Sequence, residues 1–431
     1  MKILIAGASG FIGSHIAVHL RAAGHDVTGA TRTLADARRR LPQLDWIACD
    51  FRRDRVEDWL DRLDGIDALV NCVGVLQDGL GENSRQVHVE GADALFAACE
   101  RAGVRRVIHI SAAGADDAAG SSYSRDKLAG EAALKARDLD WAVLRPSLVM
   151  ARNTYGGTAL IRSLAGLPVL TPVVGADQRF RPVMMEDVCQ TVADLLAPGA
   201  PSGVSWDIGG ADAMTMGDVV TEYRRWLGFG GTRIWSVPTW MARPAFWFGD
   251  LLGWLGVRTS MRTNSLKQLE YDVAGDPTEW LAWTARPPRG LREALDAAPA
   301  GLADRWHARL GFARPVARVV LGLFWLVSGL IALGVGHDAA RDHLLAAGFA
   351  PVFAELVLLS TAVLDIALGL AMLLKYRVRA VAGLMIATTL AYLATLTATA
   401  PALWADPLGP AVKTFPGMAL ALLMAATEDE R

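Results

Sequence analysis

The sequence predicts two domains of different kinds: an α/β domain with a doubly wound parallel sheet, then an all-α domain of four membrane-spanning helices. The 431 residues exceed the length of one ordinary domain. Apolar strands alternate with helical segments in the first half of the chain, a pattern that favours a parallel sheet. Only 15 of the 116 residues from 316 onward are charged, against 73 of the first 315, so the two parts need different solvents.

The overall composition excludes several classes of protein. Hydrophobic residues make up 52% of the chain and charged residues 20%, which is incompatible with intrinsic disorder. The formal net charge is −2, so nothing in the charge balance favours a nucleic-acid partner. The four cysteines lack the spacing of metal ligands or of a CxxC pair, which favours buried thiols in a reduced compartment.

We expect the α/β domain over residues 1–300, with a smaller substrate lobe over about 150–300. A linker over 301–315 would then lead to the membrane domain over 316–431.

The chain begins with the features of a nucleotide-binding strand, turn and helix. Residues 2–6 are apolar and predict a strand, while 14–23 show helical periodicity. Glycines in the turn between them let the backbone approach a pyrophosphate, and the helix N-terminus supplies N–H donors. The candidate cofactor-binding residues of this turn, GASGFIG, are Gly7, Ser9, Gly10, Phe11, Ile12 and Gly13.

Further strands are expected at 25–30, 45–49, 67–72 and 106–111, with a helix at 84–102. Ligands bind at the carboxyl ends of such parallel strands. The candidate residues at these ends are Thr31, Arg32, Asp50, Phe51, Cys72, Val73, Gly74 and Ser111. Asp50 and Phe51 are placed to meet the adenine.

The tip of the second strand decides the expected cofactor. An acidic residue there would bind the ribose 2′-hydroxyl of NAD(H). This chain instead has Arg32, which can pair with a 2′-phosphate. We therefore predict a preference for NADP(H), with NAD(H) as the alternative. The competing interpretation is that Arg32 is a solvated arginine like those at 38–40.

A serine, a tyrosine and a lysine predict the chemistry. Ser111 ends a strand, and Tyr123 and Lys127 form a YxxxK motif that opens the next helix. The i, i+4 spacing places both side chains on one helix face. We expect the Lys127 ammonium to lower the pKa of the Tyr123 phenol, which can then exchange a proton with a substrate oxygen. Ser111 would donate a hydrogen bond to the same oxygen.

The turn GASGFIG, the strand-end Ser111 and the motif YSRDK together resemble the short-chain dehydrogenase/reductase superfamily, which has a Rossmann fold. Residues 109–134, 141–150 and 179–188 are similar to its atypical members, among them the Rossmann-fold accessory subunit of respiratory complex I and its bacterial relatives. The resemblance covers about residues 1–300. It implies that Lys127 also holds the nicotinamide ribose. It further implies a nicotinamide pocket lined by Pro146, Ser147 and Leu148, and relatives often carry Asn where this chain has His88.

Four apolar stretches predict transmembrane helices at about 317–336, 352–374, 379–398 and 409–427, the last being the weakest. Lys and Arg are concentrated before the first stretch and between the second and third, which places both termini and the α/β domain in the cytoplasm. In span number and general character this part resembles DoxX-like four-helix proteins. We therefore predict a multi-pass protein of the bacterial inner membrane.

Two features lie outside these motifs. Residues 234–257 are rich in aromatic side chains, which favours either a lip resting on the headgroup layer or an ordinary aromatic core. Asp365 lies in the middle of the second span, where a carboxylate is costly. It either relays protons or contacts a quinone headgroup, or it stays protonated or hydrogen-bonded to threonine or tyrosine side chains of the third span.

The sequence thus predicts a membrane-anchored, NADPH-dependent oxidoreductase that reduces a carbonyl, quinone or lipid-like compound. Tyr123 would be the acid, Lys127 its electrostatic partner and Ser111 the orienting donor. The alternative is a non-catalytic NAD(P)H-binding protein that acts in a membrane complex as a structural subunit, assembly factor or redox sensor.

A nucleotide-sugar epimerase or dehydratase ranks third, because such enzymes usually prefer NAD and Arg32 argues against it. The expected partners are the lipid bilayer and a small-molecule or lipidic substrate, with neither nucleic acid nor metal. A membrane protein partner or a second copy of the chain is left open.

Overall fold

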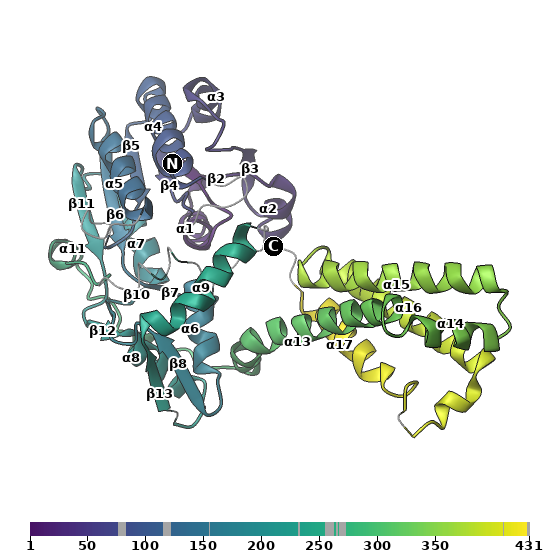
Figure 1. Cartoon of the computed structure of the whole chain (residues 1–431). Helices are drawn as coiled ribbons and strands as arrows, with labels where there is room; N and C mark the ends of the chain where they lie inside the picture. The colour runs from purple at the N-terminus through teal and green to yellow at the C-terminus, as the bar shows by residue number, and fades with distance from the viewer. Residues whose placement is uncertain are drawn as a thin grey trace. The chain divides into compact units, whose positions relative to one another are not determined.

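The computed structural model describes residues 1–75, 83–114, 122–154, 156–231, 233–254, 263, 266, 273–407 and 409–428. The chain divides into two compact units, Met1–Ala308 and Arg309–Arg431 (Figure 1). Residues 301–315, where we expected a linker, are helical from Leu302 onward and begin the long helix α13 (Leu302–Leu333).

A seven-stranded parallel sheet forms the frame of the first unit, in the order β11-β6-β5-β4-β1-β2-β3. The predicted doubly wound sheet is therefore confirmed. The strand order reverses between β1 and β4, and sheets of this kind bind ligands at the carboxyl ends of the strands at such a point. The strands are β1 (Lys2–Ala6), β2 (Asp26–Thr31), β3 (Asp45–Ala48), β4 (Ala68–Asn71), β5 (Arg106–Ile110), β6 (Asp140–Pro146) and β11 (Val204–Ile208).

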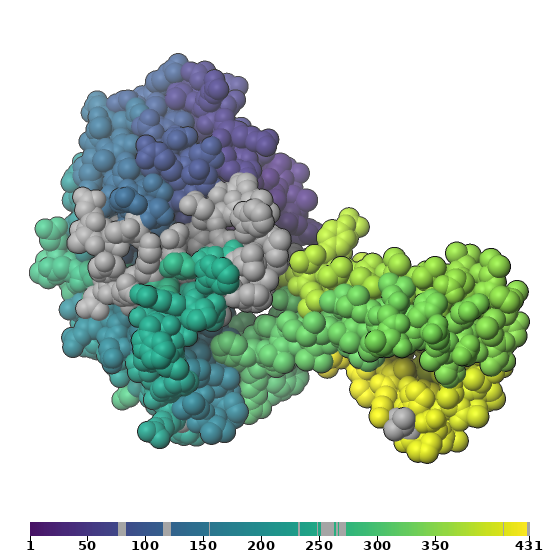
Figure 2. Space-filling model, in the orientation of Figure 1, coloured from purple at the N-terminus to yellow at the C-terminus, as the bar shows by residue number. Residues whose placement is uncertain are grey.

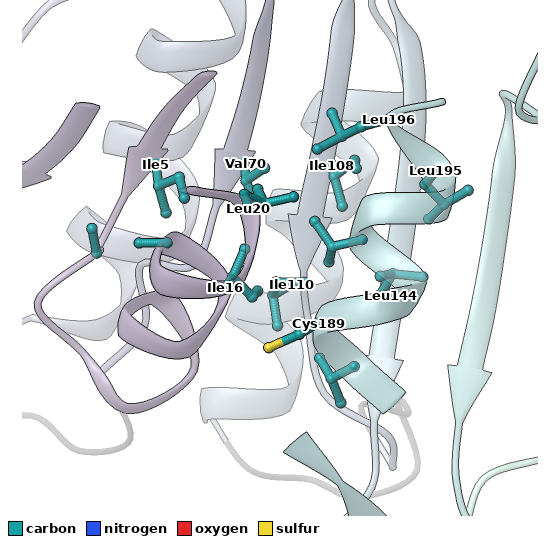
Figure 3. Packing of buried hydrophobic residues seen from close by; sticks show 14 of the residues in the cluster. Ile5, Ile16, Leu20, Val70, Ile108, Ile110, Leu144, Cys189, Leu195 and Leu196 are labelled. Carbon is teal, nitrogen blue, oxygen red and sulfur yellow. The ribbon is translucent and has the colours of Figure 1, made fainter. Parts of the chain in front are cut away.

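Helices cover both faces of this sheet. Alternate residues of β1 point to opposite faces, so that Ile5 joins one core and Leu4 the other. Figure 3 shows the first core, where Ile16 of α1 and Leu195 of α7 pack against the strands. The helices of this face are α1 (Phe11–Ala22), α2 (Leu34–Arg40) and α7 (Met185–Leu195). Those of the other face are α3 (Val56–Leu60), α4 (Gly91–Ala102) and α5 (Ser122–Lys135).

A smaller lobe is built from segments that follow β6. Its core surrounds the buried Tyr223, and a buried ion pair of 3.2 Å joins Arg162 to Asp304. Its strands pair as β7 (Val149–Met150) with β10 (Val183–Met184), β9 (Arg179–Phe180) with β12 (Met214–Thr215), and β8 (Leu170–Val174) with β13 (Arg233–Val237). Its helices are α6 (Gly157–Ala165), α8 (Met216–Trp226), α9 (Thr239–Trp254) and α12 (Leu291–Asp296). Helix α11 (Thr278–Trp283) instead packs through Trp280 against the first core of the large sheet.

The second unit is helical. Among the described residues of the chain, three helices are long and apolar enough to cross a membrane: α13, α15 (Pro351–Leu373) and α16 (Val378–Thr399). Helix α14 (His337–Ala346) lies between the first two. The fourth predicted span is shorter than expected, because α17 (Thr414–Thr427) has 14 residues. At 1.5 Å per residue it extends only about 21 Å, against about 30 Å of hydrocarbon.

Basic residues gather at one end of the second unit. The buried carboxylate of Glu428, just after α17, lies 3.1 Å from Arg314 and 3.3 Å from Lys375. Arg379 donates a hydrogen bond of 2.6 Å to the Glu428 carbonyl oxygen. These cations come from the two segments that the positive-inside rule assigns to the cytoplasm, so both segments lie at the same end of the helices.

Asp365 is buried on α15 and is partnered within the helix bundle. Tyr392 of α16 donates a hydrogen bond of 2.9 Å to its Oδ1 atom. Helices α15 and α13 pack so closely that only glycine fits at position 369: a Cβ atom at Gly369 would lie 2.5 Å from the backbone nitrogen of Leu326. The geometry therefore matches the plainer of the two interpretations of Asp365, a carboxylate satisfied by a tyrosine of the third span.

Candidate active site

The turn between β1 and α1 and the start of α1 are so tightly packed that only glycine fits at positions 7 and 13. Gly7 has a φ of +78°, and a Cβ atom there would lie 2.9 Å from the carbonyl carbon of Cys72. A Cβ atom at Gly13 would lie 2.3 Å from the carbonyl oxygen of Gly7. Helix α1 begins at Phe11 without a side-chain cap or an acidic residue in its first turn, so its N–H groups can receive an anion. These features fit the pyrophosphate of a dinucleotide.

Two residues at the end of β2 lie beside this turn: Thr31 supports it, and Arg32 places a positive charge at the surface. Thr31 is buried, and its Oγ1 lies 2.9 Å from the Oγ of Ser9, which ties the glycine turn to β2. Arg32 follows at the surface. Arg32 is close enough to Asp50 to contribute to the lowered pKa of that carboxyl, after the larger effect of hydrogen bonds from Arg52.

Two expected adenine contacts are engaged elsewhere. Arg52 donates to both carboxylate oxygens of Asp50, at 2.8 and 2.6 Å, and these bonds lower the pKa of Asp50 to about 2. Phe51 is 5% exposed, and its ring packs edge-on against Trp59 in the core. A cofactor would therefore meet a neutralised Asp50–Arg52 pair and the backbone of Phe51.

The end of β4 is fixed by a buried polar pair. Asn71 accepts a hydrogen bond of 3.1 Å from the Val73 N–H, and its amide nitrogen lies 3.2 Å from Nδ1 of His109 on β5. This arrangement sets the course of the backbone through Cys72 to Gly74. A Cβ atom at Gly74 would lie 3.5 Å from the Lys127 ammonium, so this glycine leaves space beside the lysine.

Lys127 and Ser111 meet at the carboxyl end of β5. The buried Lys127 ammonium donates a hydrogen bond of 3.1 Å to the carbonyl of Ile110, the residue before Ser111. Ser111 is 5% exposed, and its Oγ makes no well-formed hydrogen bond among the residues that the structure describes. Its contact with the nearby Glu131 carboxylate is a loose one. The hydroxyl is thus available to a ligand atom.

Tyr123 lies one helical turn before Lys127, at the start of α5. Its side chain is partly exposed, yet enough protein surrounds it that burial raises the pKa of its phenol to about 12. The expectation that Lys127 lowers this pKa is therefore wrong for this structure, in which the lysine donates to Ile110. Burial also lowers the pKa of Lys127 to about 8, against the opposing effects of Glu131 and Cys72. Tyr123 is thus protonated at neutral pH.

His88, at the position where relatives often carry Asn, touches Tyr123. It lies in a π-helical turn before α4, and its ring packs edge-on against the Tyr123 ring with centroids 5.6 Å apart. Its Nε2 lies 2.9 Å from the carbonyl oxygen of Val75 and 3.1 Å from the Val75 nitrogen. Burial, followed by the charge of Lys127, lowers the pKa of His88 to about 3, so the imidazole is neutral.

A buried ion-pair network behind the site was missed by the sequence reasoning. Glu131 is 1% exposed, and Arg145 of β6 donates to its two carboxylate oxygens at 2.8 and 2.5 Å. The signal was present in the sequence, because Tyr123, Lys127 and Glu131 recur at i, i+4 and i+8 on one helix face.

The expected wall of the nicotinamide pocket begins at Pro146, the last residue of β6. Ser147 donates a hydrogen bond of 2.5 Å to the carbonyl of Val273 and accepts one of 3.1 Å from the Arg181 N–H. Its hydroxyl is therefore used to join β6 to the smaller lobe. Leu148 packs at the edge of that lobe's apolar core.

Comparison with known proteins assigns both units. Residues 7–167 match the NAD(P)H-binding family, and residues 322–422 match the DoxX-like family. The chain joins an NAD(P)H-binding domain to a DoxX-like domain. The first has the parallel Rossmann-type sheet of an NAD(P)H-binding, oxidoreductase-like domain, and the second includes the apolar helices α15 and α16.

Two curated relatives match part of this chain. A ceramide reductase of Caulobacter vibrioides is 28% identical over 193 residues, which are 43% of this chain and 57% of that protein. Sterol demethylase protein B of Methylococcus capsulatus is 29% identical over 227 residues, which are 46% of this chain and 66% of that protein. The chain thus spans less than two thirds of the length of either relative.

Solved structures support the fold of the NAD(P)H-binding domain. The UDP-glucose 4-epimerase of Thermus thermophilus, in complex with NAD, aligns with a TM-score of 0.52 and 20% identity over 68% of this chain and 96% of its own. WbmG of Bordetella bronchiseptica, also with NAD, aligns with a TM-score of 0.52 and 17% identity over 71% of this chain and 94% of its own. At this identity the likeness concerns the fold alone.

Proposed function

We propose that this protein is a membrane-anchored reductase that uses NADPH to convert the carbonyl group of a lipid-like molecule into an alcohol. The single observation that carries the proposal is the juxtaposition at the end of β5. There a buried lysine ammonium and a serine hydroxyl with hydrogen-bonding capacity to spare lie beside the helix that presents a protonated tyrosine.

Each of the three side chains has a role in the reduction. Ser111 donates a hydrogen bond that orients the carbonyl oxygen. When bound, the reduced nicotinamide supplies a hydride to the carbonyl carbon. Tyr123 gives its phenolic proton to the carbonyl oxygen, so that C=O becomes CH–OH. For Lys127 to stabilise the phenolate left behind, its ammonium must turn from the Ile110 carbonyl toward the phenol when cofactor and substrate bind. The phenol of Tyr123 is protonated at neutral pH, as a proton donor must be.

The preference for NADPH rests on the end of β2. Arg32 stands at the surface where the adenosine ribose is expected, and a guanidinium can pair with the 2′-phosphate that distinguishes NADPH from NADH. Asp50, the nearest carboxylate, is already neutralised by Arg52, so it would not repel a phosphate.

Two observations favour a lipid-like substrate. The chain carries its own membrane domain, so a substrate dissolved in the bilayer would be concentrated beside the enzyme. In addition, the names of two of the curated relatives refer to a ceramide and a sterol, both of which are lipids. The basic residues around Glu428 support a cytoplasmic NAD(P)H-binding domain, where NADPH would be available.

The proposal is tested by following NADPH oxidation with the full-length protein in nanodiscs that contain a bacterial lipid extract. Tyr123→Phe should reduce turnover by about 10²–10⁴-fold, the usual contribution of general acid catalysis, and leave NADPH affinity unchanged. The matched control is Tyr376→Phe, which alters an exposed tyrosine of the DoxX-like domain and should leave both quantities at the wild-type level.

Firm NADPH binding with equally negligible turnover in wild type and Tyr123→Phe would contradict the proposal. The cofactor would then have a structural or sensory role, and the protein would act as a component of a membrane complex.

A further inference from the structure

The NAD(P)H-binding domain exposes large aromatic side chains on α9. Trp240 and Trp247 are 68% and 70% exposed, although tryptophan is usually well buried in soluble domains. Met241 on the same helix is 42% exposed. The sequence had suggested either a membrane lip or an aromatic core here, and the structure separates the two: Phe246 is in the core, and the two tryptophans are outside it. The side chains of Phe248 and Trp254, and residues 255–257, lie outside the described part of the segment.

The two faces of α9 are distinct. Ala242 and Phe246, four residues apart, are buried and form one apolar cluster with Val174 and Val237. Trp240 and Trp247, seven residues apart, lie on the opposite face, since each residue turns the helix by about 100°. The exposed Arg243 lies between the tryptophans on this outer face. The outward face therefore combines aromatic rings with a cation, whereas the inward face holds the helix on the domain.

The exposed apolar surface continues from α9 onto the ribbon formed by β8 and β13. The two strands are parallel, with Leu170 opposite Arg233 and Pro172 opposite Trp235, and paired residues lie on the same side. Val174 and Val237, which α9 covers, also lie on that side.

Leu170 and Trp235 remain 41% and 42% exposed beside the helix. We call the set Leu170, Trp235, Trp240, Met241 and Trp247 the aromatic face. Helix α9 lies at the outer surface of the first unit in Figure 2.

A lipid bilayer fits this surface better than any other occupant. Tryptophan prefers the boundary between headgroups and acyl chains, because its ring is apolar and its N–H group needs a polar partner. Arg243 and Arg233 can pair with lipid phosphates, as cations on interfacial helices do. A bilayer is also always within reach, because the uncharged part of α13, residues 319–333, begins shortly after the first unit ends at Ala308.

We propose that the aromatic face is a membrane-docking surface, on which the NAD(P)H-binding domain rests with Trp240 and Trp247 in the headgroup layer. Docking of this kind requires neither cofactor nor turnover, so it goes beyond the proposed reductase activity. It would hold the domain against the bilayer in addition to its covalent connection to the membrane helices.

The experiment uses the full-length protein in nanodiscs with one copy per disc, made from ordinary lipids or from lipids brominated in the upper part of the acyl chain. Bromine quenches tryptophan fluorescence at contact range. The emission of Trp240 and Trp247 is obtained by subtracting the spectrum of the variant Trp240→Phe/Trp247→Phe from that of the wild type, because the chain has 14 tryptophans. Rings inserted about 5–10 Å into the headgroup boundary should lose about half of this emission or more in brominated discs.

The matched control is Trp59→Phe, which removes a fully buried tryptophan of the other sheet face. The emission assigned to Trp59 should be the same in both lipids. Phenylalanine keeps an aromatic side chain at each position, and unchanged NADPH affinity of the variants would verify that the domain is folded.

Equal emission of the Trp240 and Trp247 pair in the two lipids would overturn the proposal. If that unquenched emission changed in discs holding two copies, the aromatic face would be an interface between copies of the chain. If the emission remained that of water-exposed tryptophan in discs with one copy and in discs with two, the face would be open to a soluble partner. The fluorescence readout is independent of turnover, so failure of docking and failure of the reductase proposal can be told apart.

Discussion

Both domains bury polar side chains, but the buried groups differ in how fully they are hydrogen-bonded. In the DoxX-like domain Asp365 has a hydrogen-bond partner for one carboxylate oxygen in Tyr392, and α15 packs closely against α13. In the NAD(P)H-binding domain, among the residues that the structure describes, the buried Lys127 makes one hydrogen bond, to a backbone carbonyl, and the Ser111 hydroxyl makes none that is well formed.

A buried polar group without sufficient partners destabilises the folded state, and such groups persist where they serve a ligand. The difference supports the proposed site of chemistry at the end of β5 and a structural role for the contact at Asp365. Each of the following predictions tests one side of this comparison.

The largest effect is expected from Lys127→Met. Turnover should fall by about 10²–10³-fold, as when an electrostatic donor is removed from a catalytic site. The apparent Tm in detergent should nevertheless equal or exceed that of the wild type at pH 7, because a buried charge is lost.

The pH dependence supplies the control for this variant. The pKa of Lys127 is lowered by burial from its ordinary value of 10.5 to about 8, so the buried ammonium costs stability below pH 8, and this cost disappears as the pH rises to 10.5. The advantage of Lys127→Met should vanish over the same range, and the exposed Lys2→Met should show none. A lower Tm at pH 7 would mean that Lys127 is a structural group like Asp365.

Arg32→Ala should weaken NADPH binding by about 10- to 100-fold, the effect of losing a charge-assisted hydrogen bond, while NADH affinity stays constant. Titration of both cofactors measures this. Arg38→Ala, which removes an exposed arginine of α2, is the control and should alter neither affinity. Equal weakening for the two cofactors would show that Arg32 supports the turn and does not recognise the 2′-phosphate.

Glu131→Gln should move the alkaline limb of the pH–rate profile to lower pH. The carboxylate of Glu131 raises the pKa of Lys127, so its removal favours the neutral amine. The pKa of Lys127 should then fall by about one unit or more, and the ammonium loses its proton at a correspondingly lower pH. Glu57→Gln removes an exposed carboxylate paired with Arg101 and should leave the profile in place. A profile unchanged by Glu131→Gln would limit Glu131 to holding Arg145.

The smallest effect is expected from Tyr392→Phe. Hydrogen bonds between membrane helices contribute about 0.6 kcal/mol on average, so the apparent Tm should fall slightly and turnover should stay within about twofold of wild type. Asp365→Asn should have an equally small effect on Tm and turnover, because the asparagine side chain can still accept a hydrogen bond from Tyr392. A tenfold loss of turnover in either variant would give Asp365 a functional role after all.

The sequence predicts the sheet and the glycine turn well, because their signals are local. The apolar run 2–6, the positive-φ position of Gly7 and the spacing of Tyr123 and Lys127 each depend on neighbouring residues. The family comparisons confirm the NAD(P)H-binding and DoxX-like assignments made from such signals.

Contacts between distant segments could not be predicted in the same way. Arg52 neutralises Asp50 through a turn geometry that no motif records, and Phe51 is turned into the core by packing against Trp59. The pKa of Tyr123 depends on burial by segments that only the folded chain brings together. Likewise, hydropathy located α17 but could not give its helical length.

That length has a consequence for the surrounding lipid. A 14-residue helix is shorter than the hydrocarbon layer, so it creates a hydrophobic mismatch on one side of the membrane domain. A bilayer relieves such mismatch by thinning locally, and Lys413 at the start of the helix can reach the nearer interface by snorkelling. Where α17 crosses a bilayer, the lipids beside it would therefore be compressed relative to those around the longer helices, and the protein would carry with it a patch of thinner membrane.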